Sequence, residues 1–296
     1  MQVELVQTTT RDGVRLDGML QRPPLPPHPQ PLSLGGERGE WKVDGLCFVH
    51  GTGGNFYGST LFDAIAARCL ERGCAVLRVN TRGHDGISNA VTARGSRRIG
   101  AAYEAVDDCR HDIAAWLTFL RELVGPRVGL LGHSLGAGKC LYALAHEPEM
   151  AVEGIIAISP PRLSYEWFCM SADGPLFLET YQKAEAFVQA GQPATLMEVK
   201  LPLPMVITAA GYVEKYGPDE RFNFLRFVSR VRCPLLFTFG ALEVASNMAF
   251  QGSTDELAMI KHPALQYVTV AEADHFYSKG RDTLVSEVDF WLASQK

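Results

Sequence analysis

Residues 128–136 read Val-Gly-Leu-Leu-Gly-His-Ser-Leu-Gly and restrict the fold more than any other part of the chain. The first four predict a short buried strand, and the apolar spacing of residues 135–146 predicts a helix that stops at Glu147-Pro148. A strand that passes so abruptly into a helix needs a sharp turn, and glycines two positions to either side of Ser134 remove side chains that would collide there. We therefore expect Ser134 to be exposed in a strained turn at the carboxyl end of a strand.

The composition indicates a globular chain without nucleic-acid or membrane partners. With 296 residues, it is long enough for a well-buried core with an insertion. Its formal net charge is −5, with both signs mixed along the chain, so we predict neither a basic face for nucleic acid nor a polybasic membrane segment. The amino terminus lacks the pattern of a signal peptide, and no stretch approaches the roughly 18 apolar residues of a membrane span, so we expect a cytoplasmic protein.

The cysteines and histidines do not suggest a disulfide framework or a metal site. The seven cysteines are scattered through predicted strands and helices without a Cys-x-x-Cys pair, and we expect them to be small buried hydrophobes. No cluster has zinc-ligand spacing, so we predict no metal. The glycine-rich segments also miss the spacing of phosphate-loop and dinucleotide fingerprints. The oligomeric state cannot be read from these features.

Predicted strands and helices alternate along most of the chain. Arg11-Asp12-Gly13 predicts the turn of an edge hairpin over residues 2–20, and the proline-rich residues 22–40 predict a surface loop. Strands are expected to end at His50 and to span 74–80, 128–131, 153–159, 234–239 and 265–271, with helices near 59–72, 97–124, 135–146 and 281–294. This order predicts an α/β fold whose mostly parallel sheet is covered on both faces.

Residues 160–231 interrupt the alternation and are too long for an ordinary connection. They contain helical patterns at 181–189 and 221–228. We therefore expect residues 1–159 and 232–296 to form the core and residues 160–231 to form a helical cap over the carboxyl ends of the strands. Aromatic residues of this cap, Trp167, Phe168 and Tyr212 among them, would line an apolar substrate pocket or form the core of the cap itself.

A serine nucleophile needs a base within hydrogen-bond reach and a third group that orients the base. His275 follows the last predicted strand directly, so a loop there would deliver it to the same sheet edge as Ser134. Glu243 follows the preceding strand after a glycine and is the expected acid, and Asp255, farther along, is the alternative. Asp274 adjoins His275 and is expected to point elsewhere, because neighbours in a chain seldom face each other.

Acyl transfer to serine also creates an oxyanion that needs hydrogen-bond donors. The backbone N–H of Leu135, at the start of the helix after Ser134, is one candidate. The second is expected from the glycine-rich segment at residues 50–55, with Thr52 preferred to Gly53.

Together these motifs resemble the α/β-hydrolase fold over essentially the whole chain. The pieces that match, in the family's order, are His50-Gly-Thr-Gly-Gly, Asn80-Thr-Arg-Gly-His84, Gly132-His-Ser-Leu-Gly136, Gly240-Ala-Leu-Glu243 and Ala273-Asp-His-Phe276. The resemblance implies an eight-stranded, mostly parallel sheet, a covalent acyl-enzyme and no cofactor. The chain departs from the family's more common pattern at Glu243, where Asp is usual.

The sequence therefore predicts a serine hydrolase that cleaves a small-molecule carboxylic ester with an apolar portion, through an acyl-enzyme on Ser134. Thioesterase, lactonase, amidase and acyltransferase chemistry would use the same three residues. Two further alternatives are a carbon–carbon hydrolase or lyase, with His275 as the principal base, and a ligand receptor without catalysis.

Overall fold

The computed structural model of the protein describes residues 2–23 and 43–295. Its centre is an eight-stranded sheet in the order β1-β2-β4-β3-β7-β8-β11-β12. The hairpin of β1 (Gln2–Thr9) and β2 (Arg15–Arg22) joins antiparallel to β4, and all other neighbours are parallel. The predicted mostly parallel sheet is confirmed. Its remaining strands are β3 (Gly45–Val49), β4 (Ala75–Val79), β7 (Val128–His133), β8 (Ile155–Ile158), β11 (Leu235–Gly240) and β12 (Leu265–Val270).

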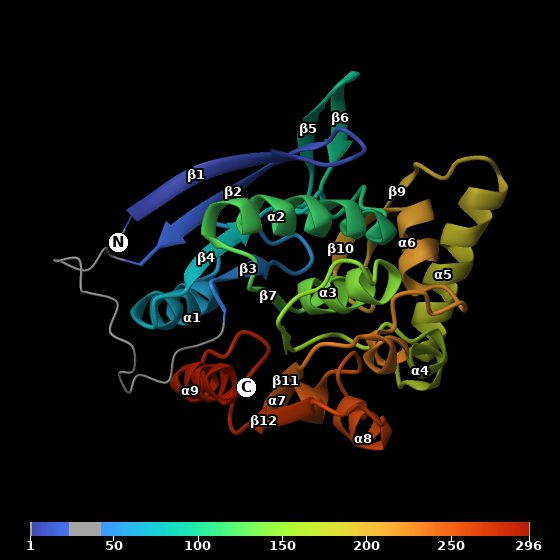
Figure 1. Cartoon of the computed structure of the whole chain (residues 1–296). Helices are drawn as coiled ribbons and strands as arrows, with labels where there is room; N and C mark the ends of the chain where they lie inside the picture. The colour runs from blue at the N-terminus through green and yellow to red at the C-terminus, as the bar shows by residue number, and fades with distance from the viewer. Residues whose placement is uncertain (1, 24–42, 296) are drawn as a thin grey trace, which may run out of the picture.

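Helices cover both faces of the sheet (Figure 1). On one face α2 (Cys109–Val124) packs beside α3 (Leu135–His146), and on the other α1 (Thr60–Glu71) packs beside α9 (Arg281–Ser294). Successive strand residues point to opposite faces, so Leu130 of β7 joins the core beneath α2 and α3, whereas Leu131 joins the core beneath α1 and α9. This double burial explains why the strands read as continuous apolar runs.

One prediction from the sequence pattern is wrong, and another lies outside the described residues. The helix expected near 97–124 begins only at Cys109, and residues before it form a hairpin of β5 (Ser88–Thr92) and β6 (Gly95–Ile99). The helix prediction was wrong there because Gly95 and Gly100 adopt φ angles of 109° and 103°, which a helix cannot contain. The proline-rich loop expected at 22–40 lies almost entirely outside the described residues.

Residues 160–231 leave the core after β8 and return to it at β11. They contain α4 (Tyr165–Met170), α5 (Gly174–Gln189), α6 (Ala209–Tyr216) and a two-stranded sheet of β9 (Leu196–Val199) and β10 (Met205–Thr208). The helices gather at one side of the molecule (Figure 1). The pattern at 181–189 lies in α5, but the pattern at 221–228 became two 3-10 turns, where the Asn223 side chain accepts from the Leu225 N–H. Two short helices, α7 (Ala241–Ser246) and α8 (Ser253–Met259), lie between β11 and β12.

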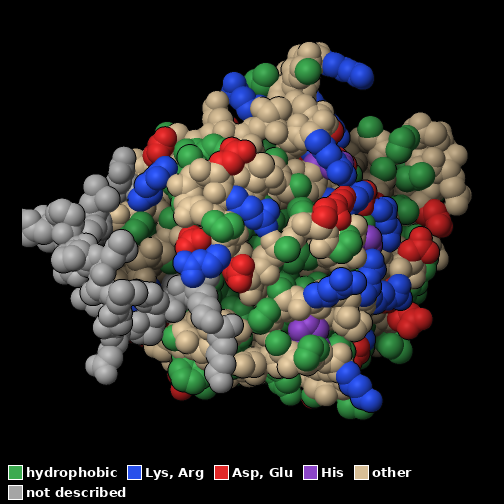
Figure 2. All heavy atoms as spheres, viewed as in Figure 1, with side chains coloured by type: hydrophobic (Ala, Val, Ile, Leu, Met, Phe, Trp, Pro, Cys, Tyr) green, Lys and Arg blue, Asp and Glu red, His purple; other side chains and the backbone are tan. Residues whose placement is uncertain are grey.

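The surface carries charges of both signs. On the face in Figure 2, Lys and Arg side chains are interspersed with Asp and Glu. Ion pairs such as Arg110 with Asp107, 2.8 Å apart, hold opposite charges together. The view therefore agrees with the mixed charge of the sequence. In the part of the chain that the structure describes, no helix is long and apolar enough to cross a membrane.

Arg82, which follows β4, holds three separate segments together through a buried ion cluster. Its guanidinium lies 2.7 Å from Asp112 of α2 and 2.8 Å from both Asp12 and Asp108. The Asp112 side chain is 0% exposed, and burial raises the pKa of Asp112 although Arg82 acts in the opposite direction. Arg82 therefore joins the β1–β2 turn to the start of α2.

We expect Arg82→Met to lower the free energy of unfolding by about 3–5 kcal/mol, because it leaves the Asp112 carboxylate buried without its partner. Urea unfolding followed by circular dichroism measures this change. Arg97→Met is the matched control: Arg97 is 49% exposed and lies 3.7 Å from Asp108, so its loss should change stability by less than about 0.5 kcal/mol. Equal stability of the two variants would contradict the assigned role of Arg82.

Candidate active site

Ser134 lies in the predicted sharp turn between β7 and α3. Its backbone has φ 56° and ψ −131°, a strained conformation for a residue other than glycine. A Cβ on Gly136 would lie 2.1 Å from the Val49 carbonyl oxygen, and a Cβ on Gly132 would lie 2.5 Å from the Ala137 backbone. The Ser134 N–H donates to the carbonyl oxygen of Ile158 in β8 at 2.8 Å. The strand, turn and helix expected from the sequence are therefore confirmed.

The structure brings His275 and Glu243 together, although 32 positions separate them. Nδ1–H of His275 donates to Oε2 of Glu243 at 2.7 Å. Glu243 lies in α7 directly after β11 and is 2% exposed, and its Oε1 also accepts from the Gly240 N–H at 2.7 Å and from the Ser159 hydroxyl. These contacts fix both the carboxylate and the tautomer of His275.

The other acids considered from the sequence lie elsewhere. Asp255 is exposed on α8. The Asp274 carboxylate accepts from the N–H groups of Phe276 and Ser278 at 3.0 and 2.9 Å, which turns it away from the neighbouring imidazole. Glu243 is thus the carboxylate that contacts His275.

His275 reaches the sheet edge that carries Ser134. Its carbonyl oxygen accepts from Nε2–H of His133, the residue before Ser134, at 2.8 Å, and the two imidazole centroids are 4.7 Å apart. Burial, reinforced by repulsion from His275, lowers the pKa of His133 to about 3, so that this ring is neutral. The Ser134 hydroxyl makes no hydrogen bond to another described residue and faces a pocket.

The glycine-rich loop after β3 packs directly against Ser134. A Cβ on Gly51 would lie 2.8 Å from the Ser134 Cβ, so the close approach requires glycine. His50 anchors the loop: its Nδ1–H donates to the Gly51 carbonyl oxygen at 2.7 Å, and its Nε2 accepts from the Thr81 N–H at 3.0 Å. Burial and the nearby charge of Lys139 lower the pKa of His50 to about 3, so the imidazole is neutral and carries its proton on Nδ1.

Two pockets adjoin this loop. One, of about 340 Å³, is lined by residues of the loop, the start of α1, His133, Ser134 and Phe276. The other, of about 70 Å³, is lined by Thr52 and Leu135 together with Pro161, Leu163, Pro202, Leu203, Lys215, Tyr216, Asn247, Ala249 and Phe250. Thr52 therefore borders both pockets, and Leu135, the first residue of α3, borders the smaller one.

The aromatic residues predicted to bind substrate have different surroundings. Phe168 and Tyr212 are both 0% exposed, and both rings contact Phe177 within residues 160–231, at centroid distances of 5.3 and 6.4 Å. They form the core of this segment, and neither of them lines the two pockets beside the glycine-rich loop. Trp167 is partly exposed, but its indole N–H donates to the Met248 carbonyl oxygen at 2.9 Å and its ring lies against Arg162.

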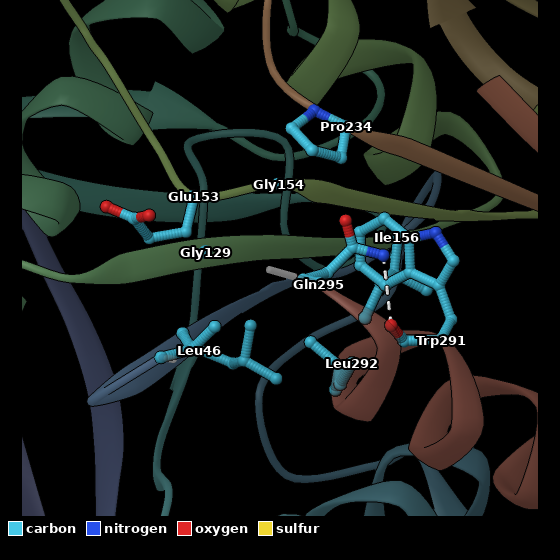
Figure 3. Close-up of a pocket in the computed structure, with 10 residues that line it drawn as sticks. Leu46, Gly129, Glu153, Gly154, Ile156, Pro234, Trp291, Leu292 and Gln295 are labelled. Carbon is cyan, nitrogen blue, oxygen red and sulfur yellow. Dashed lines mark hydrogen bonds between the residues drawn. The ribbon is translucent and has the colours of Figure 1, made fainter. Parts of the chain in front are cut away.

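A pocket of about 160 Å³ lies at the opposite edge of the sheet (Figure 3). It is bordered by Leu46 of β3, Gly129 of β7 and Trp291 of α9, near the amino ends of the parallel strands. Glu153 is the titratable residue of its lining, which includes no Ser, Cys or His. This pocket therefore lacks the groups that the Ser134 edge provides.

Ser159 is a site residue that sequence reasoning missed. It directly follows β8, between the strands that carry Ser134 and Glu243, and its hydroxyl donates to Glu243. The Tyr277 hydroxyl lies 3.2 Å from the Ser159 hydroxyl and 3.0 Å from that of Thr238. The sequence did contain one indication of this role, because Ser159 lies at the carboxyl end of a predicted parallel strand. Among residues 2–23 and 43–295, which the structure describes, no group of His, Cys, Asp and Glu could hold a metal ion.

Solved structures with a similar fold include several hydrolases. Est1E from Butyrivibrio proteoclasticus with ferulic acid bound is 16% identical, with a TM-score of 0.66 and coverage of 98% of this chain and 99% of that chain. Alpha/beta hydrolase GrgF from Penicillium sp. sh18 is 16% identical, with a TM-score of 0.65 and coverage of 100% and 99%. Esterase PF2001 from Pyrococcus furiosus is 17% identical, with a TM-score of 0.62 and coverage of 99% and 91%.

At such identities these likenesses show a shared fold alone. The comparison with curated proteins gave no match. The sequence model of the Alpha/beta hydrolase family matches residues 48–289, which include the Ser134 turn, Glu243 and His275. This match covers well over half of the chain, and the chain therefore belongs to the alpha/beta hydrolase family.

Proposed function

We propose that the protein is a serine hydrolase that cleaves a carboxylic ester of a small molecule. The observation that carries this proposal is the 2.7 Å hydrogen bond between His275 and the buried Glu243, on the sheet edge where Ser134 is held in a strained turn. A carboxylate that orients a histidine near a solvent-accessible serine is the arrangement that activates a serine hydroxyl, and Ser134 is half-buried at the edge of a pocket.

In the proposed mechanism, Ser134 Oγ attacks the ester carbonyl carbon while His275 Nε2 accepts the hydroxyl proton. Glu243 stabilises the resulting imidazolium through its bond to Nδ1–H. The tetrahedral oxyanion accepts from the N–H groups of Leu135, the first residue of α3, and Thr52, in the glycine-rich loop, which border the same pocket. The carbon–oxygen ester bond then breaks, and His275 returns its proton to the departing alcohol. Water, deprotonated by His275, attacks the acyl-enzyme and releases the carboxylic acid and Ser134.

We also propose that residues 160–231 act as a cap that selects the substrate. Six residues of this segment border the small pocket beside Thr52 and Leu135, and four of them, Pro161, Leu163, Pro202 and Leu203, are apolar. This favours a substrate with an apolar portion. Solved structures described as esterases, such as the Pyrococcus furiosus protein, share the fold and are consistent with this chemistry.

We expect the protein to hydrolyse p-nitrophenyl esters within the series from acetate to octanoate, and Ser134→Ala to lose at least about 10³-fold in kcat/KM because the nucleophile is removed. Release of p-nitrophenol measures both rates. A fluorophosphonate should label Ser134 in the wild type and leave the variant unlabelled.

Circular dichroism of both proteins is the control for folding. Acyl-thioesters, lactones and amides in the same assay distinguish the other acyl-transfer reactions. If the phosphonate labels Ser134 but no ester is hydrolysed, the proposed ester cleavage is contradicted, whereas the activation of Ser134 is supported. A folded protein that neither reacts with the phosphonate nor turns over any substrate would favour a ligand receptor.

Glu243→Gln should lower kcat by about 10³- to 10⁴-fold, because the amide can neither fix the tautomer of His275 nor stabilise its charged form. Ser159→Ala should have a smaller effect, about 10-fold, because Glu243 keeps its bonds to His275 and to the Gly240 N–H. Initial rates with the best ester of the series measure both effects.

Asp255→Asn is the matched control, because Asp255 is the other acid considered from the sequence and is exposed on α8. Its kcat should remain within about 2-fold of the wild type. A loss at Asp255 as large as that at Glu243 would overturn the assignment of the acid.

A further inference from the structure

Three buried charged residues form a cluster behind the glycine-rich loop. Lys139 of α3 and Lys215 of α6 both contact the carboxylate of Glu104, which lies between β6 and α2. The Lys139 ammonium contacts Oε1, and the Lys215 ammonium lies 3.5 Å from Oε2. The Lys139 side chain is 0% exposed, and those of Lys215 and Glu104 are each 1% exposed. The cluster thus joins α6, in the 160–231 segment, to the helix that begins after Ser134.

The cluster contains two cationic side chains for one carboxylate. Burial by itself would raise the pKa of Glu104, but the two neighbouring lysines lower it to about 2, so Glu104 is ionised. Burial lowers the pKa of Lys215, whereas the charge of Glu104 opposes this. His50 adds no charge, because burial and the charge of Lys139 lower its pKa to about 3. Glu214, the other nearby acid, accepts from the Val106 N–H at 3.1 Å and lies 3.6 Å from Arg221.

Within the described part of the chain, Lys139 has a second partner that Lys215 lacks. The Lys139 ammonium donates to the Thr81 hydroxyl at 3.1 Å, and Thr81 in turn contacts His50. Among the residues that the structure describes, the Lys215 ammonium makes one hydrogen bond, the long contact with Glu104, which uses one of its three protons. An ammonium group out of water with so few acceptors is strongly destabilising unless an anion or another acceptor approaches it.

Lys215 is one of the residues that line the small pocket beside the reaction centre. Thr52 and Leu135, whose N–H groups are the proposed oxyanion donors, border the same pocket of about 70 Å³. Tyr216, next to Lys215, also borders it, and its hydroxyl makes no hydrogen bond to the described residues. A space of this volume holds a group as small as a carboxylate, which would accept from both side chains. The larger pocket, with Ser134 and Phe276, remains for the other part of the ester.

We propose that this pocket is a subsite for a carboxylate on the acyl portion of the substrate, with Lys215 as the specificity-determining residue. The substrate class is then a monoester of a short dicarboxylic acid, whose free carboxylate pairs with Lys215 while its ester carbonyl meets Ser134. This inference rests on the proposed serine hydrolase. Apolar residues such as Leu163 and Leu203 contact the carbon chain between the two carbonyl groups.

The test compares monoethyl succinate with ethyl 4-oxopentanoate, a neutral ester of nearly the same shape in which a methyl group replaces the carboxylate oxygen. Ethanol release measures kcat and KM for each ester. The wild type should prefer the charged ester by about 10- to 100-fold in kcat/KM, the range expected for hydrogen bonds to a charged group. Equal rates for the two esters would overturn the proposal.

Lys215→Met should remove this preference, chiefly by raising KM for monoethyl succinate, and should leave the neutral ester within about 3-fold. Glu104 keeps Lys139 as its partner in this variant, and turnover of the neutral ester reports that the protein is folded. Lys183→Met, at an exposed position of α5, is the matched control for loss of one positive charge and should alter neither ester by more than about 2-fold. An equal loss for both esters in Lys215→Met would assign Lys215 a structural role and overturn the proposal.

A binding measurement separates failure of this inference from failure of the proposed function. Calorimetric titration of monoethyl succinate into Ser134→Ala, with and without Lys215→Met, requires no turnover. Binding that Lys215→Met weakens about 10-fold or more supports the subsite even if no ester is hydrolysed. Absence of binding to Ser134→Ala, or binding that is unaffected by Lys215→Met, overturns the subsite while the hydrolysis of neutral esters by the wild type remains as evidence for the function.

Discussion

The arrangement of the site depends on the close approach of three pieces of backbone around Ser134. The end of β3, the end of β7 and the first turn of α3 meet so tightly that a Cβ on Gly136 would lie 2.1 Å from the Val49 carbonyl oxygen. On the other side, Gly51 leaves just enough room for the Ser134 side chain. Because the main chains touch, the start of a helix and a glycine-rich loop lie next to the serine, and backbone N–H groups can face the same small volume.

The parallel sheet gathers the remaining groups at the same edge. In the sheet β8 lies next to β7, and β11 lies next to β8. Ser159 directly follows β8 and Gly240 ends β11, and both contact Glu243. β12 delivers His275 by one further step. Glu243 therefore receives bonds from a serine after β8, a backbone N–H at the end of β11 and the imidazole after β12. Such a network is rigid because each member is held by a different strand.

Much of the fold follows from local patterns that the sequence displays openly. The apolar runs predicted β3, β4, β7, β8 and β11, since strands buried on both faces need apolar residues at nearly every position. The edge strand β12, which is largely not buried, was also predicted. The positions of Glu243 and His275 directly after two such strands predicted their meeting at one edge. The helix predicted before residue 109 is replaced by a hairpin, because the glycines at 95 and 100 adopt positive φ angles that a helix cannot contain.

By itself, the sequence determined the order along the chain of the strands in the central sheet and of most helices that cover it, the sharp turn at Ser134 and the family, because each depends on residues that are close together in the chain. The tertiary structure decided which distant side chains share a volume. It buried Phe168 and Tyr212 within the 160–231 segment, placed Ser159 against Glu243, and brought Lys139, Lys215 and Glu104 into one cluster beside the site. Those contacts join residues up to 111 positions apart, and packing between separate elements, which no local pattern records, is what creates them.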